Sequence, residues 1–206
     1  MGAMTKMYQK NEHLRAFIEK NCLLADVDIF LSTGTQSSFY FDCKKATLSG
    51  ESLSLIVDAV ISVIDDLPEQ PTAIGGLTMG ADPIIAGVVA RAHQLNRPPI
   101  HGSIVRKEPK KHGTKSRIEN QLPSGTKIVV IDDVITSGSS VKIACKEFLA
   151  EGYIIVGIIA LIDRKAGGKE SLESEFGSVP VQTLFDKNDF PALRTSHEFK
   201  TVAEAA

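Results

Sequence analysis

Apolar residues recur along the chain in two patterns that alternate with each other. In one, they lie three and four positions apart and share one face of a helix. Such helices are predicted at residues 8–21, 50–64, 82–95 and 141–150. The other is a short apolar run, typical of a buried strand, at residues 72–74, 100–105, 128–131 and 154–162. Strands that are apolar on both faces and alternate with helices predict an α/β fold with a parallel sheet covered on both sides.

Turn and capping residues support this division. Ser49 precedes the second helix as a candidate N-cap, and Asp82-Pro83 offers the third an N-cap and a first-turn proline. Before the second helix, residues 29–31 and 37–41 are short strand-like runs around a glycine-containing segment, which predicts a hairpin. In parallel sheets of this kind, active sites lie beyond the carboxyl ends of the strands.

Two acids and a run of small residues follow the strand at 128–131. Asp132 and Asp133 come first, and residues 136–140 are Thr-Ser-Gly-Ser-Ser directly before a helix. Unpaired N–H groups at a helix N-terminus bind phosphate, and small side chains let it approach the backbone. A ribose 5-phosphate suits this segment, because its phosphate can bind the small residues and its free ring hydroxyls can bind the acids. The alternative is a simple helix cap, in which Asp133 or Thr136 caps the helix and Ser and Gly fill a turn.

A second charged segment lies at residues 106–117, which contain six Lys or Arg residues and one acid. It begins a stretch of some twenty residues without clear secondary structure, which is usually a lid or a disordered segment. A solvated loop, a nucleic-acid patch and a clamp on a pyrophosphate leaving group are the three interpretations. No aromatic residue is interleaved for base stacking, and the clamp explains why a cationic loop would lie beside a phosphate site.

Composition narrows the class of protein. The chain has 206 residues with 23 Lys and Arg against 25 Asp and Glu, a formal charge of −2, which disfavours binding of nucleic acid through the field of the whole molecule. Three cysteines form no CxxC pair, which favours free thiols in a reducing compartment over a disulfide or zinc scaffold. The longest apolar run, 154–162, is too short to cross a bilayer, and residues 1–6 have no apolar signal core. We therefore expect a cytoplasmic protein without membrane or nucleic-acid partners.

Residues 128–140, IVVIDDVITSGSS, resemble the phosphoribosyl-diphosphate (PRPP) motif of the type I phosphoribosyltransferases. The resemblance implies a central, mostly parallel sheet flanked by helices, with a small hood built from the N-terminal hairpin and the C-terminal segment. It implies one domain over 1–206, divided into 1–70, a core at 71–165 with a mobile loop at 106–120, and a C-terminal segment at 166–206. In the family the acids hold the ribose hydroxyls and the loop holds the 5-phosphate. The PRPP-binding residues implied here are Asp132, Asp133, Val134, Ile135, Thr136, Ser137, Gly138, Ser139 and Ser140.

The basic segment is similar to the R-K-x-x-K-x-H-G loop of the orotate phosphoribosyltransferases. In that family the loop closes over the active site of the partner subunit. The resemblance implies a homodimer in which Arg106, Lys110 and His112 bind PRPP in the other protomer, whereas Lys107 serves its own. Lys110 is the expected cation on the departing pyrophosphate, which makes Lys110, Asp132 and Asp133 the catalytic candidates.

Residues 31–41 are similar to the hairpin of the same family, which implies that Tyr40 and Phe41 lie along the orotate ring. A buried hairpin face is the alternative for these two residues. Arg164, at the end of the strand at 154–162, would pair with the orotate carboxylate, since a guanidinium suits a carboxylate. In the family the Thr of the PRPP loop, here Thr136, also touches the base.

Two positions depart from the family pattern. Many members carry Lys where this chain has Ser32, and an aromatic–Lys pair where it has Met79-Gly80. Backbone N–H groups of residues 78–81 could form an anion-binding nest in place of the missing charge.

The implied reaction joins PRPP to N1 of orotate and releases pyrophosphate, with Mg²⁺ held largely by PRPP oxygens and by no dedicated protein site. A phosphoribosyltransferase for another base, such as a purine or uracil, is one alternative. A PRPP-sensing regulator without turnover is the other. It would normally need a nucleic-acid-binding element, and the 25 N-terminal residues are too short for a winged helix.

Overall fold

The computed structural model describes residues 2–30, 36–108 and 116–193, without the side chains of residues 2–10. Its centre is a six-stranded sheet in the order β5-β4-β3-β6-β7-β8. All neighbouring strands are parallel except β4 and β5, which are antiparallel. The bounds are β3 Ala73–Leu77, β4 His101–Val105, β5 Ile118–Glu119, β6 Lys127–Ile135, β7 Ile154–Asp163 and β8 Val181–Asp186. The predicted α/β fold with a mostly parallel sheet is confirmed.

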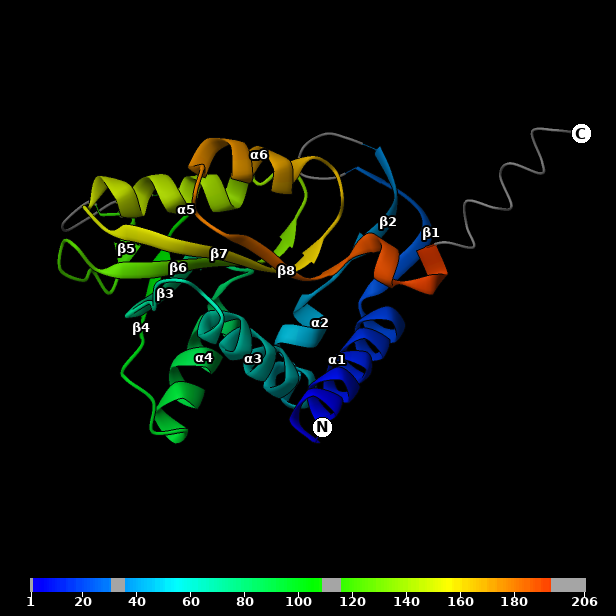
Figure 1. Cartoon of the computed structure of the whole chain (residues 1–206). Helices are drawn as coiled ribbons and strands as arrows, with labels where there is room; N and C mark the ends of the chain where they lie inside the picture. Colours follow the sequence, from blue (N-terminus) through cyan, green and yellow to red (C-terminus); the bar gives the residue numbers. More distant parts are fainter. Residues whose placement is uncertain (1, 31–35, 109–115, 194–206) are drawn as a thin grey trace, which may run out of the picture.

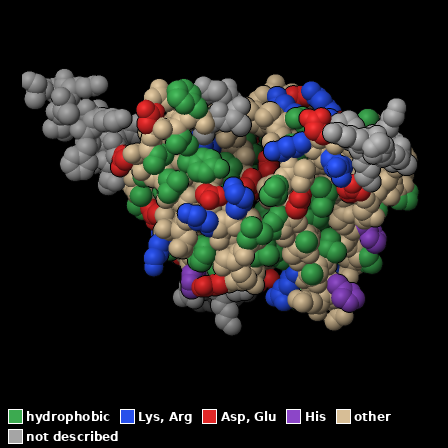
Figure 2. Space-filling model, turned by 180° about the vertical axis from the view of Figure 1, so that it is seen from behind, with side chains coloured by type: hydrophobic (Ala, Val, Ile, Leu, Met, Phe, Trp, Pro, Cys, Tyr) green, Lys and Arg blue, Asp and Glu red, His purple; other side chains and the backbone are tan. Residues whose placement is uncertain are grey.

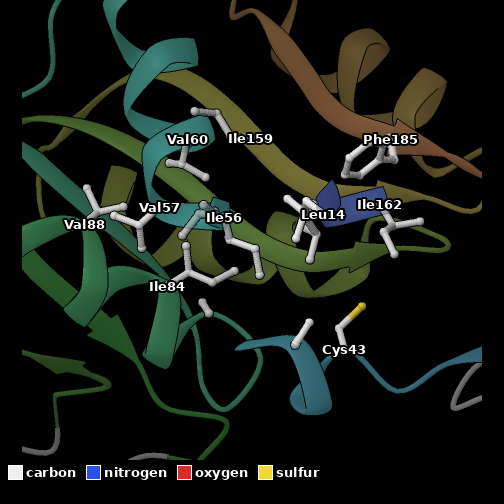
Figure 3. Close-up of a cluster of buried hydrophobic side chains, with 14 of the residues drawn as sticks. Leu14, Cys43, Ile56, Val57, Val60, Ile84, Val88, Ile159, Ile162 and Phe185 are labelled. Carbon is white, nitrogen blue, oxygen red and sulfur yellow. The ribbon is translucent and has the colours of Figure 1, made fainter. Parts of the chain in front are cut away.

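Helices cover both faces of this sheet (Figure 1). One face carries α1 (Gly2–Asn21), α3 (Gly50–Asp65) and α4 (Asp82–Gln94), and the other carries α5 (Ser139–Ala150) and α6 (Gly168–Phe176). Successive side chains of β6 point to opposite faces, so Val129 packs in the cluster under α3 and α4 and Val130 in the cluster under α5. Figure 3 shows the first cluster, in which Val60 approaches Ile159 of β7.

A separate two-stranded antiparallel sheet, β1 (Leu23–Phe30) with β2 (Gln36–Phe41), forms the predicted hairpin. It leads into the short helix α2 (Lys44–Thr47). The chain after β8 returns to this side through the 3-10 turn η1 (Lys187–Asp189). There Phe190 packs against Phe41, with ring centroids 4.9 Å apart. Of the C-terminal segment expected in the hood, only the residues after β8 lie there, because β8 itself joins the main sheet; residues 194–206 lie outside the described part.

Several boundaries differ from the sequence-based predictions. The helix expected from residue 8 begins at Gly2, and α2, α6 and β8 were not predicted. The sequence of α6, GKESLESEF, shows why: only Leu172 and Phe176 in it are large and apolar. Ser49 is the N-cap residue of α3 as expected, without a side-chain cap bond. Asp82 is the first residue of α4 instead of its N-cap, and its carboxylate accepts the Thr78 hydroxyl at 2.7 Å.

Across the described residues, we find no helix with the length and apolar character that spanning a membrane requires.

Candidate active site

The two acids lie within strand β6, near its carboxyl end. The sequence pattern ended this strand at Ile131, which is wrong, because β6 continues to Ile135. It continues because β7 is ten residues long and pairs with it as far as Ile135 and Asp163. Asp132 therefore pairs with Ala160 of β7 in the sheet, and it is only 7% exposed.

Burial governs the electrostatics of this acid pair. Burial raises the pKa of Asp132 well above its usual value, and the neighbouring charge of Asp133 raises it further, against an opposing effect of Lys107. Burial also raises the pKa of Asp133, with Lys44 among the groups that oppose the shift. Backbone N–H groups hold the carboxylates, since Asp133 N donates to Asp132 Oδ1 at 3.0 Å and Val134 N to Asp133 Oδ1 at 2.9 Å. The two carboxylates are therefore held in place, and they favour a ligand that donates hydrogen bonds to them or carries positive charge.

The small residues after β6 turn the chain into α5. Gly138, the N-cap residue, has φ of 76°, a left-handed conformation that glycine adopts without strain. The N-cap residue of α5 is Gly138, so neither Asp133 nor Thr136 caps this helix as the alternative predicted. Ser139 N donates weakly to Ser137 Oγ at 3.4 Å. A helix N-terminus lined by hydroxyls at the carboxyl edge of a parallel sheet is suited to an anion.

The turn between β3 and α4, residues 78–81, passes directly beside the acids. A Cβ atom at Gly80 would lie 2.5 Å from Asp133 Oδ1 and 3.2 Å from Asp132 Oδ1. A side chain at this position would require the Asp133 carboxylate to shift, so here the turn adjoins the acid pair through its backbone. The other departure from the family pattern, Ser32, lies outside the described residues.

A cavity of about 470 Å³ joins the acid side of the site to the hairpin. It is lined by Ile29, Phe30, Tyr40, Phe41, Asp133, Val134, Thr136 and Arg164. The structure thus brings together all four residues that the resemblance assigns to the base, next to one of the acids. Phe41 is only 3% exposed and packs on Phe39 and Phe190, so most of its ring belongs to the core.

Arg164 connects the main sheet to the hairpin. Its Nη2 donates to Ser37 Oγ at 2.7 Å and to the Phe39 carbonyl oxygen at 2.9 Å, and the guanidinium lies 4.3 Å from the centre of the Phe39 ring. Burial lowers the pKa of this arginine. The fully buried Asp163 fixes the turn that follows, because its Oδ1 accepts the backbone N–H of Lys165 at 2.8 Å. No role was predicted from the sequence for Asp163 or Ser37. Asp163 directly precedes Arg164 in the chain, whereas only the fold brings Ser37 to it.

The described part of the basic segment is anchored at both ends. Arg106 pairs with Glu119 at 3.0 Å, and Arg117 pairs with Glu147 at 2.7 Å and donates to the carbonyl of Lys107 at 2.6 Å. The short strand β5 interrupts the stretch that was expected to be irregular. Lys110 and His112 lie outside the described residues. Seen from behind (Figure 2), acidic and basic side chains gather where the surface is hollowed between the two halves of the molecule.

Comparison with known proteins agrees with this arrangement. Residues 49–190 match the phosphoribosyl transferase domain. The chain is 39% identical over 178 residues to the orotate phosphoribosyltransferase of Aquifex aeolicus, covering 85% of this chain and 94% of that protein. It is 40% identical over 163 residues to the enzyme of that name from Nostoc sp., covering 78% and 77%.

Solved structures extend the comparison to the fold. The crystal structure of Mycobacterium tuberculosis orotate phosphoribosyltransferase in complex with PRPP superimposes with a TM-score of 0.69 at 26% identity, covering 88% of this chain and 98% of that one. Because both the sequence and the fold match over most of the chain, it belongs to the orotate phosphoribosyltransferases of the phosphoribosyltransferase family.

Proposed function

We propose that this protein transfers the 5-phosphoribosyl group of PRPP to N1 of orotate, giving orotidine 5-monophosphate and pyrophosphate for pyrimidine nucleotide synthesis in the cytoplasm. One observation carries most of the weight. A single cavity places Arg164 and Tyr40 beside Asp133 and Thr136, so a cation for an acidic base and an aromatic ring adjoin the acids and the phosphate loop. This combination suits a flat, carboxylate-bearing base joined to a phosphorylated sugar.

In this proposal each part of the site binds one part of the substrates. The N-terminus of α5 and residues 136–140 bind the 5-phosphate through backbone N–H groups and hydroxyls. Asp132 and Asp133 accept hydrogen bonds from the ribose hydroxyls, and Lys107, whose charge acts on Asp132, neutralises their side of the site. Arg164, at the end of β7, binds the orotate carboxylate while it is held by its hydrogen bonds to the hairpin.

The described residues contain no group of three or more His, Cys, Asp or Glu that could hold a metal ion alone. The two adjacent carboxylates of Asp132 and Asp133 nevertheless fit Mg²⁺ if PRPP oxygens and water complete its coordination. When bound, the ion supplies positive charge that offsets the pyrophosphate. The residues of the chain hold the ribose hydroxyls and so position the sugar.

The bond between C1 and the pyrophosphate oxygen breaks, and its electron pair leaves with pyrophosphate, as N1 of orotate bonds to C1 with inversion and gives up its proton to water. No protein nucleophile takes part. Positive charge grows on the ribose ring and negative charge on the leaving group, so catalysis comes from positioning and fixed charges. The acids stabilise the ring, and Lys110 stabilises the departing pyrophosphate. In this proposal the chain is one domain that works as a homodimer, with the basic loop shared across the interface.

The test combines the purified protein with PRPP, Mg²⁺ and one base at a time: orotate, uracil, adenine or hypoxanthine. We expect pyrophosphate release and orotidine 5-monophosphate with orotate, and little product with the other bases or with excess chelator. Faster turnover of another base would assign a different substrate. PRPP binding without turnover of any base would indicate the regulator and overturn the proposal.

A further inference from the structure

Arg164 is a buried cation whose partners in the described part of the chain are neutral. It is 5% exposed, and no carboxylate of the described residues forms an ion pair with its guanidinium. Its contacts are the Ser37 hydroxyl, the Phe39 carbonyl oxygen and the face of the Phe39 ring. A buried charge without a counter-ion is costly. The positive charge therefore remains available to an anion in the cavity that Arg164 lines.

The two hydrogen bonds to the hairpin use one nitrogen of the guanidinium. Nη2 donates to Ser37 Oγ at 2.7 Å and to the Phe39 carbonyl oxygen at 2.9 Å, which accounts for both of its N–H groups. Nη1 and Nε form no hydrogen bond with any residue that the structure describes. The hairpin thus restricts how the guanidinium can rotate and leaves two of its nitrogens for a ligand.

The Ser37 hydroxyl is itself fixed in orientation. It donates its proton to the Phe39 carbonyl oxygen at 2.8 Å, so toward Arg164 it acts as an acceptor. The backbone N–H of Phe39 donates to the same hydroxyl oxygen at 3.3 Å. Ser37 is not among the residues that line the cavity with Arg164. An effect of this serine on a ligand there would therefore pass through the arginine.

We propose that Ser37 is a positioning residue for the base: its hydroxyl holds the guanidinium of Arg164 so that the remaining N–H groups bind the carboxylate of orotate. The inference rests on the proposed function, which makes orotate the ligand. A hydroxyl is suited to this task because it accepts a hydrogen bond without neutralising the charge that the ligand needs. An acid at position 37 would hold the guanidinium too, but it would compete with orotate for that charge.

The rival explanation is that Ser37 only stabilises the hairpin through its hydrogen bonds to Phe39. In that case the loss of its hydroxyl would have the same effect whether or not Arg164 is present. Ser38 offers a matched control. It is the next residue of β2 and is exposed, and its side chain points to the opposite face of the strand.

The first experiment compares Ser37→Ala, Ser37→Thr and Ser38→Ala in the full-length protein, with Tm measured to confirm folding. We expect Ser37→Ala to raise KM for orotate about tenfold, the equivalent of one hydrogen bond to a charged group, with little change in KM for PRPP. Ser37→Thr keeps the hydroxyl and most of the affinity, and Ser38→Ala resembles the unmodified protein. An unchanged KM for orotate in Ser37→Ala, or an equal rise in both KM values, overturns the inference.

A double-mutant cycle with Arg164→Met separates the two explanations. The probe is orotidine 5-monophosphate, whose binding is measured by calorimetry and needs no turnover. If Ser37 acts through Arg164, Ser37→Ala weakens binding about tenfold in the otherwise unmodified protein and has little further effect in Arg164→Met. Equal losses in both backgrounds assign Ser37 to the hairpin alone and overturn the inference.

Failure of the proposed function gives a different result. An unmodified protein that neither turns over orotate nor binds orotidine 5-monophosphate refutes the proposed function, and the role of Ser37 toward orotate is refuted with it. If the unmodified protein does both and Ser37→Ala behaves like it, the inference alone is refuted.

Discussion

At the scale of single residues, the site places charge where it costs stability. Asp132 and Asp133 are adjacent acids inside a strand, and burial raises the pKa of both. A raised acid pKa means that the folded state disfavours the charged form. Such a pair is expected where function requires it, since a buried amide would satisfy the same backbone donor without the charge.

Asp132→Asn therefore tests how much the buried charge of Asp132 lowers the stability of the folded protein. Above the usual aspartate pKa of about 3.9, the folded protein binds more protons at this site than the unfolded chain, so the contribution of Asp132 to stability falls as pH rises toward its folded pKa. The variant removes that cost. We expect its Tm to exceed that of the unmodified protein by about 2–4 °C or more at pH 8, the effect of roughly 1 kcal/mol, and to differ little near pH 4.

The same variant should lose at least about 10²-fold in kcat/KM, because a fixed charge beside the reacting ribose is removed. Thermal melts at pH 4 and pH 8 check the expected change in Tm, and assays with PRPP and orotate check the expected loss in kcat/KM. Asp66→Asn, at the exposed end of α3, is the control and should change neither quantity. A variant that is less stable at pH 8 than the unmodified protein would contradict the burial cost.

At the scale of elements, α6 supports the phosphate loop from behind. A Cβ at Gly168 would lie 2.8 Å from the amide nitrogen of Gly138 and in still closer contact with the carbonyl of Thr136. Leu172 of the same helix is fully buried and would meet a Cβ at Gly138 at 3.0 Å. The proposed phosphate-binding loop thus takes its shape partly from a helix that follows β7, some thirty residues later in the chain.

Gly168→Ala should weaken phosphate binding because the added methyl group displaces the loop backbone. We expect KM for PRPP to rise about tenfold, a change of about 1.4 kcal/mol, while KM for orotate changes little. Gly50→Ala, where a Cβ meets nothing within 4 Å, is the matched control. Equal increases in both KM values would indicate general loss of structure instead of a local effect on the loop.

At the scale of the whole molecule, the proposed sharing of the basic loop predicts how subunits combine. Lys110→Ala should lower kcat about 10²–10³-fold, the effect of removing one transition-state donor, and Asp133→Asn should also be impaired. If Lys110 acts in the partner's site, a mixed dimer of the two variants contains one intact site. A 1:1 mixture allowed to exchange subunits should then regain about a quarter of full activity, since half of the two-fold dimers are mixed.

The reciprocal mixture provides the control. A protomer carrying both changes, mixed with unmodified protein, leaves no intact site in the mixed dimer if the loop is shared, and one intact site if it is not. After verified exchange, activity should fall from about one half to about one quarter of the full value if the loop is shared, and stay at about one half if it is not. An unchanged activity in this mixture, together with no recovery in the first mixture, would show that each loop serves its own site.

Much of this architecture could be predicted from the sequence, because the information is local. The buried strands and helices follow from periodicity over a few residues. Residues 132–140 form one uninterrupted segment, so the error in the strand boundary did not change which residues were predicted to form the site. By contrast, α6 has only two large apolar residues, and the apolar residues of β8, Val181, Leu184 and Phe185, do not alternate with polar ones. Their own sequence therefore did not distinguish these elements from loops. They are ordered by packing against a sheet that already exists.

The sequence by itself determined the fold class, the acid pair and the phosphate loop, since each follows from neighbouring residues. Only the tertiary structure decided what surrounds them. Arg164 meets Ser37 across 127 positions of the chain, and Gly80 abuts Asp133. Such contacts depend on how strands and helices pack, and no spacing within one segment encodes them.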